Sequence, residues 1–190
     1  PTDEQLVLDL QSGETDSLGH LVARWEQPLF RFVYRMLPRP EDARDVCQET
    51  FLRILTRADR FERGARFSTW MYQIALNLCR DQMRRKRRWG LLMAVPSPTD
   101  DAPLEKIPSG DDPAETTSRA EKARAVGRAL ERIPPEQREV LILKEYEGLK
   151  FREIAEILGC PESTVKSRMY NGLTGLRTIL TREGITTGDA

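Results

Sequence analysis

The sequence predicts an all-α protein of two small helical domains joined by a flexible linker rich in proline and aspartate. Apolar residues recur at helical spacing through most of the chain, and the alternation typical of strands is nearly absent. Between residues 95 and 118, five prolines stand among serine, threonine and aspartate, a composition that does not support a packed core. We therefore expect a first domain at 1–95, a linker at 96–117 and a second domain at 118–190.

Charge is distributed unevenly, although the chain as a whole is neutral. It holds 30 basic and 30 acidic side chains in 190 residues, a high charged fraction that suits helices with one solvated face. Residues 1–95 carry a net charge of +3, residues 96–118 a net charge of −5 and residues 119–190 a net charge of +2. Two basic blocks separated by an acidic strip are compatible with a nucleic-acid partner.

The residue types present disfavour several classes of protein. Cys47, Cys79 and Cys160 lie far apart and form no CxxC pattern, so we expect no metal site or disulfide framework. Cys47 and Cys79 fit as small core residues. His20 is the only histidine, which disfavours hydrolases that need a general base. No apolar stretch could span a membrane and the acidic N-terminus lacks a signal-peptide pattern, so the protein is expected to be cytoplasmic, without membrane insertion.

Three helices are expected in the first part of the first domain. Residues 4–12 and 16–37 have helical periodicity, and Pro38 and Pro40 end the second of these helices. A third helix at 41–57 starts with acidic residues, which favour the positive helix end. Its apolar stripe contains Ala43, Val46, Cys47, Thr50, Phe51, Ile54 and Leu55. Outside that stripe lie Asp45, Gln48, Glu49, Leu52 and Arg53.

A charged loop at 61–66 and a helix from Ser68 to about Arg88 complete the first domain. The end of this helix is dense in cations, which indicates either phosphate neutralisation or a solvated helix end: Arg80, Arg84, Arg85, Lys86, Arg87 and Arg88. Only Asp81 opposes them along the sequence. Aromatic rings precede them, an arrangement that suits stacking on unpaired bases: Phe61, Phe67, Trp70 and Tyr72. Trp70, at helical spacing from Ile74, fits the core better than a ligand contact.

The second domain is expected to hold helices at 118–133, 136–146, 150–158 and 163–181. Gly159 stands where a left-handed residue would end the third of them, and Ser163 or Thr164 can cap the fourth. The buried face of the fourth helix is predicted to be Val165, Met169, Leu173, Leu176 and Leu180. The spacing of Ala155, Gly159 and Val165 meets the steric demands of a helix-turn-helix. An ordinary helical hairpin with a solvated polar face is the alternative.

Three segments resemble bacterial sigma factors. EDARDVCQETFLR at 41–53 resembles the polymerase-binding helix of region 2, and FSTWMYQIALN at 67–77 resembles the promoter-melting and −10 segment that follows it. IPPEQREVL at 133–141 through STVKSR at 163–168 is similar to region 4, which binds the −35 element. These segments follow the family's order, and a chain with only these two domains resembles the extracytoplasmic-function (group IV) type.

The resemblance implies a sigma factor that binds core RNA polymerase, reads −35 and −10 promoter elements and helps to melt DNA. It implies no enzymatic activity, no catalytic residue and no cofactor or metal. The residues implied in binding the polymerase β′ coiled coil are Asp45, Gln48, Glu49, Leu52 and Arg53. Those implied in −10 recognition and melting are Phe61, Arg63, Arg66, Trp70, Asn77, Arg80, Arg84, Arg85 and Arg88. Those implied in −35 recognition are Ser163, Thr164, Lys166, Ser167, Arg168, Tyr170 and Asn171.

The resemblance also implies further contacts. The 61–66 loop with Asn77 would receive a base flipped from the non-template strand. The second domain would touch the polymerase β flap, the acidic linker would pass near the RNA exit path, and an anti-sigma factor would hold the protein inactive. One departure concerns the middle of the recognition helix, where the family usually has a basic residue and this chain has Met169 to Leu173. The −35 sequence therefore stays open.

Two other functions are weaker interpretations. A response regulator or repressor with a helix-turn-helix would need upstream strands, and residues 1–95 show no strand pattern. A helical nuclease or hydrolase could use Asp42, Asp45 and Glu49 as metal ligands, but no fourth ligand or histidine accompanies them.

Overall fold

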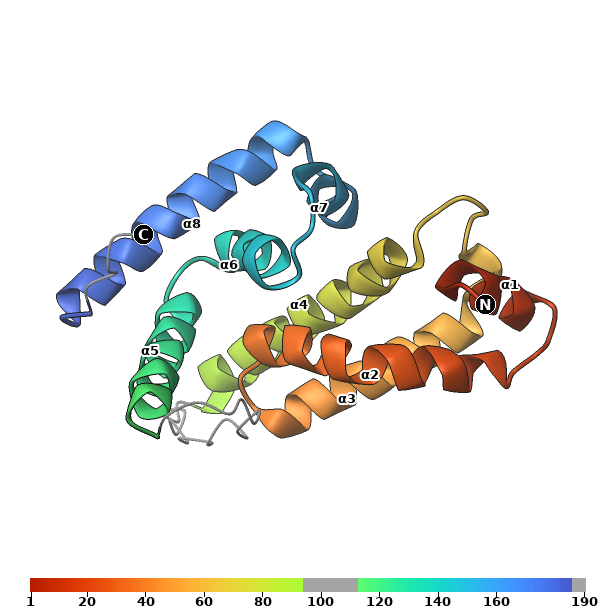
Figure 1. Ribbon diagram of the computed structural model, residues 1–190, viewed down its shortest axis with the longest axis horizontal. Helices are drawn as coiled ribbons and strands as arrows, with labels where there is room; N and C mark the ends of the chain where they lie inside the picture. The colour runs from red at the N-terminus through yellow and green to blue at the C-terminus, as the bar shows by residue number, and fades with distance from the viewer. Residues whose placement is uncertain (94–112, 186–190) are drawn as a thin grey trace. The chain divides into compact units, whose positions relative to one another are not determined.

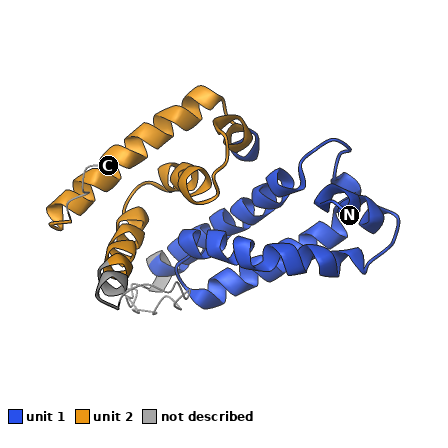
Figure 2. Ribbon diagram, viewed as in Figure 1, with its two compact units in different colours: residues 1–99, 156–159 blue, residues 100–155, 160–190 orange. Residues whose placement is uncertain are grey.

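The computed structural model describes residues 1–93 and 113–185, and every secondary-structure element in these ranges is a helix or helical turn (Figure 1). The prediction of an all-α fold is confirmed. The chain divides into two compact units, residues 1–99 with 156–159 and residues 100–155 with 160–190, coloured separately in Figure 2. Of the predicted linker, residues 96–112 lie outside the described residues.

The first unit contains α1 (Asp3–Gln11), α2 (Ser17–Met36), α3 (Pro40–Thr56) and α4 (Phe67–Met93), with a 3-10 turn at Ala58–Arg60. The predicted helices are present, and α4 continues five residues beyond Arg88. Aromatic rings from α2 and α4 meet edge to face in the core: Phe32 and Tyr72 lie 5.0 Å apart between ring centroids, and Trp25 and Phe67 lie 5.9 Å apart. Such pairs add to the stabilisation that burial provides.

Two cysteines belong to this core, as predicted. Cys47 is 7 % exposed and Cys79 is fully buried. Burial, followed by the negative charge of Glu26, raises the pKa of the Cys47 thiol to about 12. The thiol therefore stays protonated at neutral pH and behaves as a small apolar side chain.

The second unit contains α5 (Pro113–Glu131), α6 (Pro135–Leu141), the first part of α7 (Phe151–Leu158) and α8 (Glu162–Arg182), while residues 156–158 at the end of α7 are grouped with the first unit. One helix bound differs from expectation, because α5 begins five residues before Ser118. The predicted helix at 136–146 is present, as the α-helix α6 followed by a π-turn at Ile142–Tyr146. The core is aliphatic, with these fully buried residues: Val140, Ile142, Leu143, Ile154 and Val165.

Arg138 is the one basic residue of the described chain that lies buried in a core. Its Nη2 donates to the carbonyl oxygen of Glu131, at 2.8 Å, and so satisfies a carbonyl at the end of α5. Burial lowers the pKa of Arg138, against the nearby carboxylates of Glu131 and Glu139, which raise it. Arg132, the residue after α5, pairs at 2.7 Å with Glu183, the residue after α8. These contacts fix the end of α5 against the neighbouring helices.

Candidate nucleic-acid interface

The face of α3 that the sequence left outside the apolar stripe is solvent-accessible. Leu52 is 52 % exposed, and Asp45 and Gln48 are also exposed. Arg53 Nε donates to Glu49 Oε1 at 2.8 Å, an i,i+4 ion pair beside Leu52. A single exposed leucine surrounded by acidic and amide groups can dock on a partner without disturbing the α3 core.

The 61–66 loop between α3 and α4 contains both exposed and buried side chains. Arg63 and Arg66 are exposed, and Gly64 has φ +90°, a left-handed conformation that suits glycine. Phe61 differs from expectation, because its ring is 4 % exposed and packs on Trp70 with centroids 5.3 Å apart. Direct contact between Phe61 and DNA is at odds with this burial. Phe61 instead anchors the start of the loop to the core through its contact with Trp70.

The other aromatic residues of this segment are also wholly or partly buried. Phe67 and Tyr72, which suggested base stacking, are core residues in contact with α2. Trp70 is half-buried against Phe61, as its helical spacing favoured. The interleaving of aromatic and basic residues in the sequence therefore reflects a helix with an aromatic core face. Local sequence could not separate the two roles, since both place rings at similar spacing.

The cations at the end of α4 are not equivalent. Arg85, Arg87 and Arg88 are exposed, and Arg84 pairs with Asp81 one turn earlier. Lys86 pairs with Asp42 at the start of α3, which also accepts a hydrogen bond from Gln82 Nε2 at 3.0 Å. Asp81 is thus not the only acidic residue that opposes this cluster. Asp42 lies far away in sequence, and Lys86 serves to join α3 to α4.

The two remaining residues of α4 that were predicted to bind the −10 region differ in their exposure to solvent. Asn77 is exposed and Arg80 is half-buried. They stand roughly one to three turns before the exposed Arg85, Arg87 and Arg88, since an α-helix has about 3.6 residues per turn. From Asn77 onward, the helix therefore presents one amide and several guanidinium groups.

The turn between α7 and α8 has the predicted form. Gly159 has φ +63°, and the amide of Cys160 donates to the carbonyl oxygen of Ala155 at 3.2 Å, which closes the end of α7. The predicted capping residues were wrong. α8 begins at Glu162 after Pro161, and no side chain caps it, so Ser163 and Thr164 already lie in the first helical turn. The hydroxyl groups of these two residues are therefore not needed to cap the helix.

The buried face of α8 was predicted with one error. Leu173 is 42 % exposed, whereas Gly172 is buried. A Cβ atom on Gly172 would lie 3.0 Å from Leu141 Cδ1 and 3.3 Å from Gln137 Cβ, so the glycine allows α6 and α8 to approach closely. The true stripe runs through residues 165, 169, 172, 176 and 180. The helical spacing predicted most of this stripe, but Gly172 was missed because glycine has no apolar side chain.

The opposite face of α8 exposes small polar groups and one long cation. Exposed there are Ser163, Lys166, Ser167, Tyr170 and Asn171, while Thr164 and Arg168 are half-buried. Tyr170 is 71 % exposed. Lys166 Nζ lies 5.7 Å from the ring centroid of Phe151 at the start of α7, a distance compatible with a cation–π contact. Hydroxyl and amide groups repeated at one-turn intervals can contact base edges in a groove.

Sequence reasoning missed the contribution of α1. Glu4 and Gln11 make hydrogen bonds to the backbone at the two ends of the 61–66 loop. No local motif marks them, because each is a common polar residue on a helix and its partner lies about 50 to 60 residues away.

Within the described ranges, no group of three or more histidine, cysteine or acidic side chains is placed to hold a metal ion. Asp42, proposed as one ligand in the nuclease alternative, is instead occupied by Lys86 and Gln82. None of the helices described is both long and apolar enough to cross a membrane.

Family models match both units. Residues 21–89 match Sigma-70 region 2, and residues 123–175 match Sigma-70, region 4. The first match contains α3 and most of α4, and the second contains the whole of α6 and α7 and most of α8. The surfaces described above fall inside these matches.

Known proteins with similar sequences and structures agree with this result. The ECF RNA polymerase sigma factor SigW of Bacillus subtilis is 30 % identical over 173 residues, which cover 90 % of this chain and 92 % of SigW. CnrH, solved in complex with the cytosolic domain of CnrY, superposes with a TM-score of 0.69 at 25 % identity, covering 95 % of this chain and 97 % of CnrH. The sigma factor RpoE of Bartonella quintana, solved with the anti-sigma factor NepR, shares the fold at 23 % identity, with a TM-score of 0.70 and coverage of 86 % and 96 %.

Proposed function

Because the chain belongs to the extracytoplasmic-function group of sigma-70 factors, which direct transcription initiation by RNA polymerase and are not enzymes, we propose that its two units share promoter recognition. The observation that carries this proposal is that each family match includes a helix with an exposed polar or basic face that its own core does not need. α3 and α4 provide such faces in the first unit, and α8 provides one in the second.

α3 binds core polymerase in this proposal. The β′ coiled coil is the expected partner, with Leu52 entering an apolar site and Asp45, Gln48, Glu49 and Arg53 making the polar rim. The exposure of Leu52 and the position of the Glu49–Arg53 pair next to it support this arrangement. Interfaces of this kind depend on a buried apolar anchor surrounded by polar contacts that exclude water.

α4 and the loop before it bind the −10 region. A base unstacked from the non-template strand enters the loop, where Arg63 and Arg66 are exposed, and Asn77 on α4 provides an exposed amide for it. Unstacking costs a few kcal/mol, which the new contacts offset. Trp70 and Phe61 shape this site from the core side, and Arg80, Arg84, Arg85 and Arg88 neutralise phosphates along the strand.

α8 enters the major groove at the −35 element. Ser163, Ser167 and Asn171 follow one another at one-turn intervals and contact base edges, with Tyr170 beside them. Thr164, Lys166 and Arg168 hold phosphates and set the register of the helix on the duplex. Because Asn171 stands where the family usually has a basic residue, adenine is expected at the base it reads.

Two protein partners complete the proposal. The second unit contacts the polymerase β flap, and an anti-sigma factor covers one or more of these surfaces until a signal releases it. The co-crystal of RpoE with NepR supports the second partner by analogy of fold. The protein acts in the cytoplasm, where RNA polymerase is found.

Transcription from a promoter library tests the function directly. The full chain, mixed with core polymerase and templates with randomised upstream sequences, should yield transcripts from a subset that shares a −35 and a −10 element. Core polymerase alone, and core with the Leu52→Asp chain, are the controls. If the wild-type chain binds core polymerase but enriches no common element, promoter recognition by this chain is refuted.

A further inference from the structure

The loop at 61–66 is held at both ends by one helix. Gln11 Nε2 donates to the carbonyl oxygens of Ala58 and Phe61, each at 2.9 Å, where the chain enters the loop. Glu4 Oε1 accepts a hydrogen bond from the backbone amide of Phe67 at 3.1 Å, where the chain leaves the loop and α4 begins. Glu4 and Gln11 are seven residues apart, and therefore lie on the same face of α1 two turns from each other.

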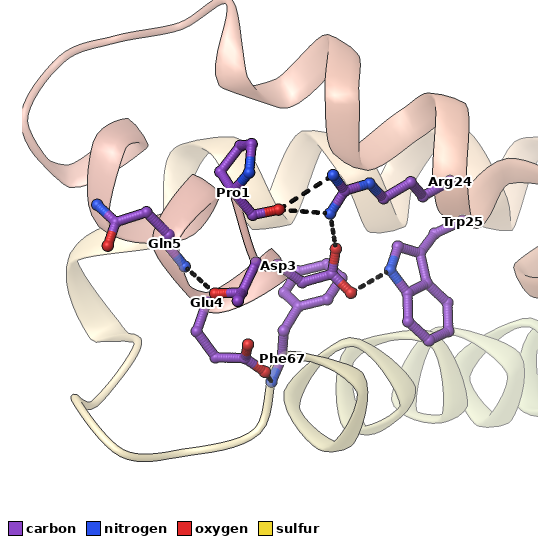
Figure 3. A network of polar contacts seen from close by, with 8 residues as sticks. Pro1, Asp3, Glu4, Gln5, Arg24, Trp25 and Phe67 are labelled. Carbon is purple, nitrogen blue, oxygen red and sulfur yellow. Dashed lines mark hydrogen bonds and ion pairs between the residues drawn. The ribbon is translucent and has the colours of Figure 1, made fainter.

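α1 is itself anchored, so it can serve as a rigid reference. The Asp3 carboxylate accepts hydrogen bonds from Arg24 Nη1 at 2.8 Å and from Trp25 Nε1 at 2.9 Å, which join α1 to α2 (Figure 3). Thr2 caps the helix, since its Oγ1 accepts from the amide of Gln5. Leu6 and Val7 are buried beneath it. Figure 3 shows Glu4 extending from α1 toward Phe67 while Asp3 turns toward Arg24 and Trp25.

A hollow of about 430 Å³ lies between α1 and the loop. Gln5, Asp9 and Ser12 line it from the helix, and Phe61, Arg63 and Gly64 line it from the loop. The loop itself has one internal backbone hydrogen bond across its turn, from the amide of Ala65 to the carbonyl oxygen of Glu62. Its shape therefore depends on how its ends are held.

We propose that α1 is a clamp that fixes the 61–66 loop in the shape needed to capture an unstacked base, with Glu4 and Gln11 as positioning residues. This inference rests on the proposed role of the loop at the −10 region. A loop with free ends would have to be ordered on binding, and the lost conformational entropy would weaken the affinity for the base. Glu4 also satisfies an amide at the start of α4, where a negative charge is favourable.

The experiment uses holoenzyme and a promoter pre-melted across the −10 region, with the fluorescent base 2-aminopurine in the non-template strand. Glu4→Ala and Gln11→Ala should each lower the affinity for this promoter about ten-fold, the loss expected when a hydrogen bond that orders a site is removed. Glu4→Gln should restore most of the affinity, because its amide oxygen can still accept from Phe67. Gln11→Glu should not restore it, because a carboxylate cannot donate to Phe61.

Matched controls separate this role from general stability. Glu14→Ala removes an exposed acidic residue just beyond α1 and should behave as wild type. Binding of the clamp variants to core polymerase and to a −35 duplex should stay unchanged, as should the helical circular-dichroism signal. If Glu4→Ala unfolds the first unit, Gln11→Ala and the Glu4→Gln rescue decide the question.

The outcomes distinguish the inference from the function beneath it. If wild-type holoenzyme leaves the fluorescence of 2-aminopurine unchanged at every −10 position, the loop captures no base and the proposed function of the loop is refuted. If wild type captures the base and the clamp variants do so equally well, the clamp alone is refuted. Equal losses on the pre-melted promoter, the −35 duplex and core polymerase would also refute it, since they would show a structural effect only.

Discussion

The end of α4 and the face of α8 both extend toward solvent, but they expose different chemistry. α4 presents the guanidinium groups of Arg85, Arg87 and Arg88, whereas α8 presents mainly hydroxyl and amide groups with Lys166 beside them. Guanidinium groups attract phosphates regardless of sequence, and amides and hydroxyls can distinguish base edges. In the proposed function, α4 therefore contributes mainly to the affinity for DNA, and α8 contributes mainly to the sequence specificity.

The two units also position their surfaces by different means. In the first unit, side-chain hydrogen bonds connect distant segments: Gln11 to the loop, Glu4 to α4 and Asp42 to Lys86. In the second, close packing at Gly172 sets the position of α8 against α6. A loop without a core of its own needs polar contacts at its ends, while a long helix can be placed by its buried face.

The largest expected difference between the units is in polymerase binding. Leu52→Asp in the first unit should weaken binding to core polymerase more than about thirty-fold, because it puts a charge at the centre of the proposed interface. Leu173→Asp changes another exposed leucine, 42 % accessible, in the second unit and should weaken the binding much less. Both are measured by competition for fluorescently labelled core polymerase. Comparable losses would remove the distinction between the two surfaces, and loss of helical signal in Leu52→Asp would mean that the faces of α3 are misassigned.

Of the two glycines in α8, only Gly172 should be sensitive to substitution by a larger residue. Gly172→Val is expected to lower the free energy of unfolding of the second unit by about 1–3 kcal/mol, because added atoms would press on Leu141 and Gln137. Gly175→Ala, one turn along the same helix, meets only Ile133 Cγ2 at 3.4 Å and should be neutral or stabilising. Urea denaturation followed by circular dichroism gives both values. Equal stability of the two variants would contradict the close approach of α6 and α8.

Sequence specificity should respond to Asn171. Asn171→Arg is expected to change the preferred base at one −35 position from adenine to guanine, with discrimination of about 1–3 kcal/mol for a good bidentate contact. Selection from a randomised −35 library with each protein measures the change. The same preference in both selections would show that Asn171 reads no base, and that specificity comes from other residues of α8.

The smallest expected effect is a change in salt dependence. Replacing Arg85 and Arg88 together by alanine should reduce the slope of log affinity against log salt concentration, on a pre-melted promoter, by about 1.5. Lys86→Ala should reduce it less, because Lys86 is paired with Asp42. Asn171→Ala should leave the slope unchanged on a −35 duplex. A double arginine variant with the wild-type slope would show that the basic end of α4 is only solvated.

Much of the fold could be predicted because the signals for it are local. Apolar spacing predicted α1 to α4 and the buried stripe of α3, and Gly159 marked the turn before α8. The charge of exposed faces was equally readable. Errors arose where a residue had two possible roles at one spacing, as for Phe61 and Tyr72, or where close packing uses a residue without an apolar side chain, as at Gly172.

By itself, the sequence determined the all-α class, the helices, the stripe of α3 that is buried and the sigma-factor family, since each depends on periodicity or on contiguous motifs. Only the tertiary structure decided that Glu4 and Gln11 hold the 61–66 loop, that Asp42 engages Lys86, and that Phe61 faces the core. The physical reason is the separation along the sequence of the residues that interact. Helical periodicity acts over a few residues, whereas these partners are separated by 44 to 63 residues and meet only when α1, α3 and α4 are packed.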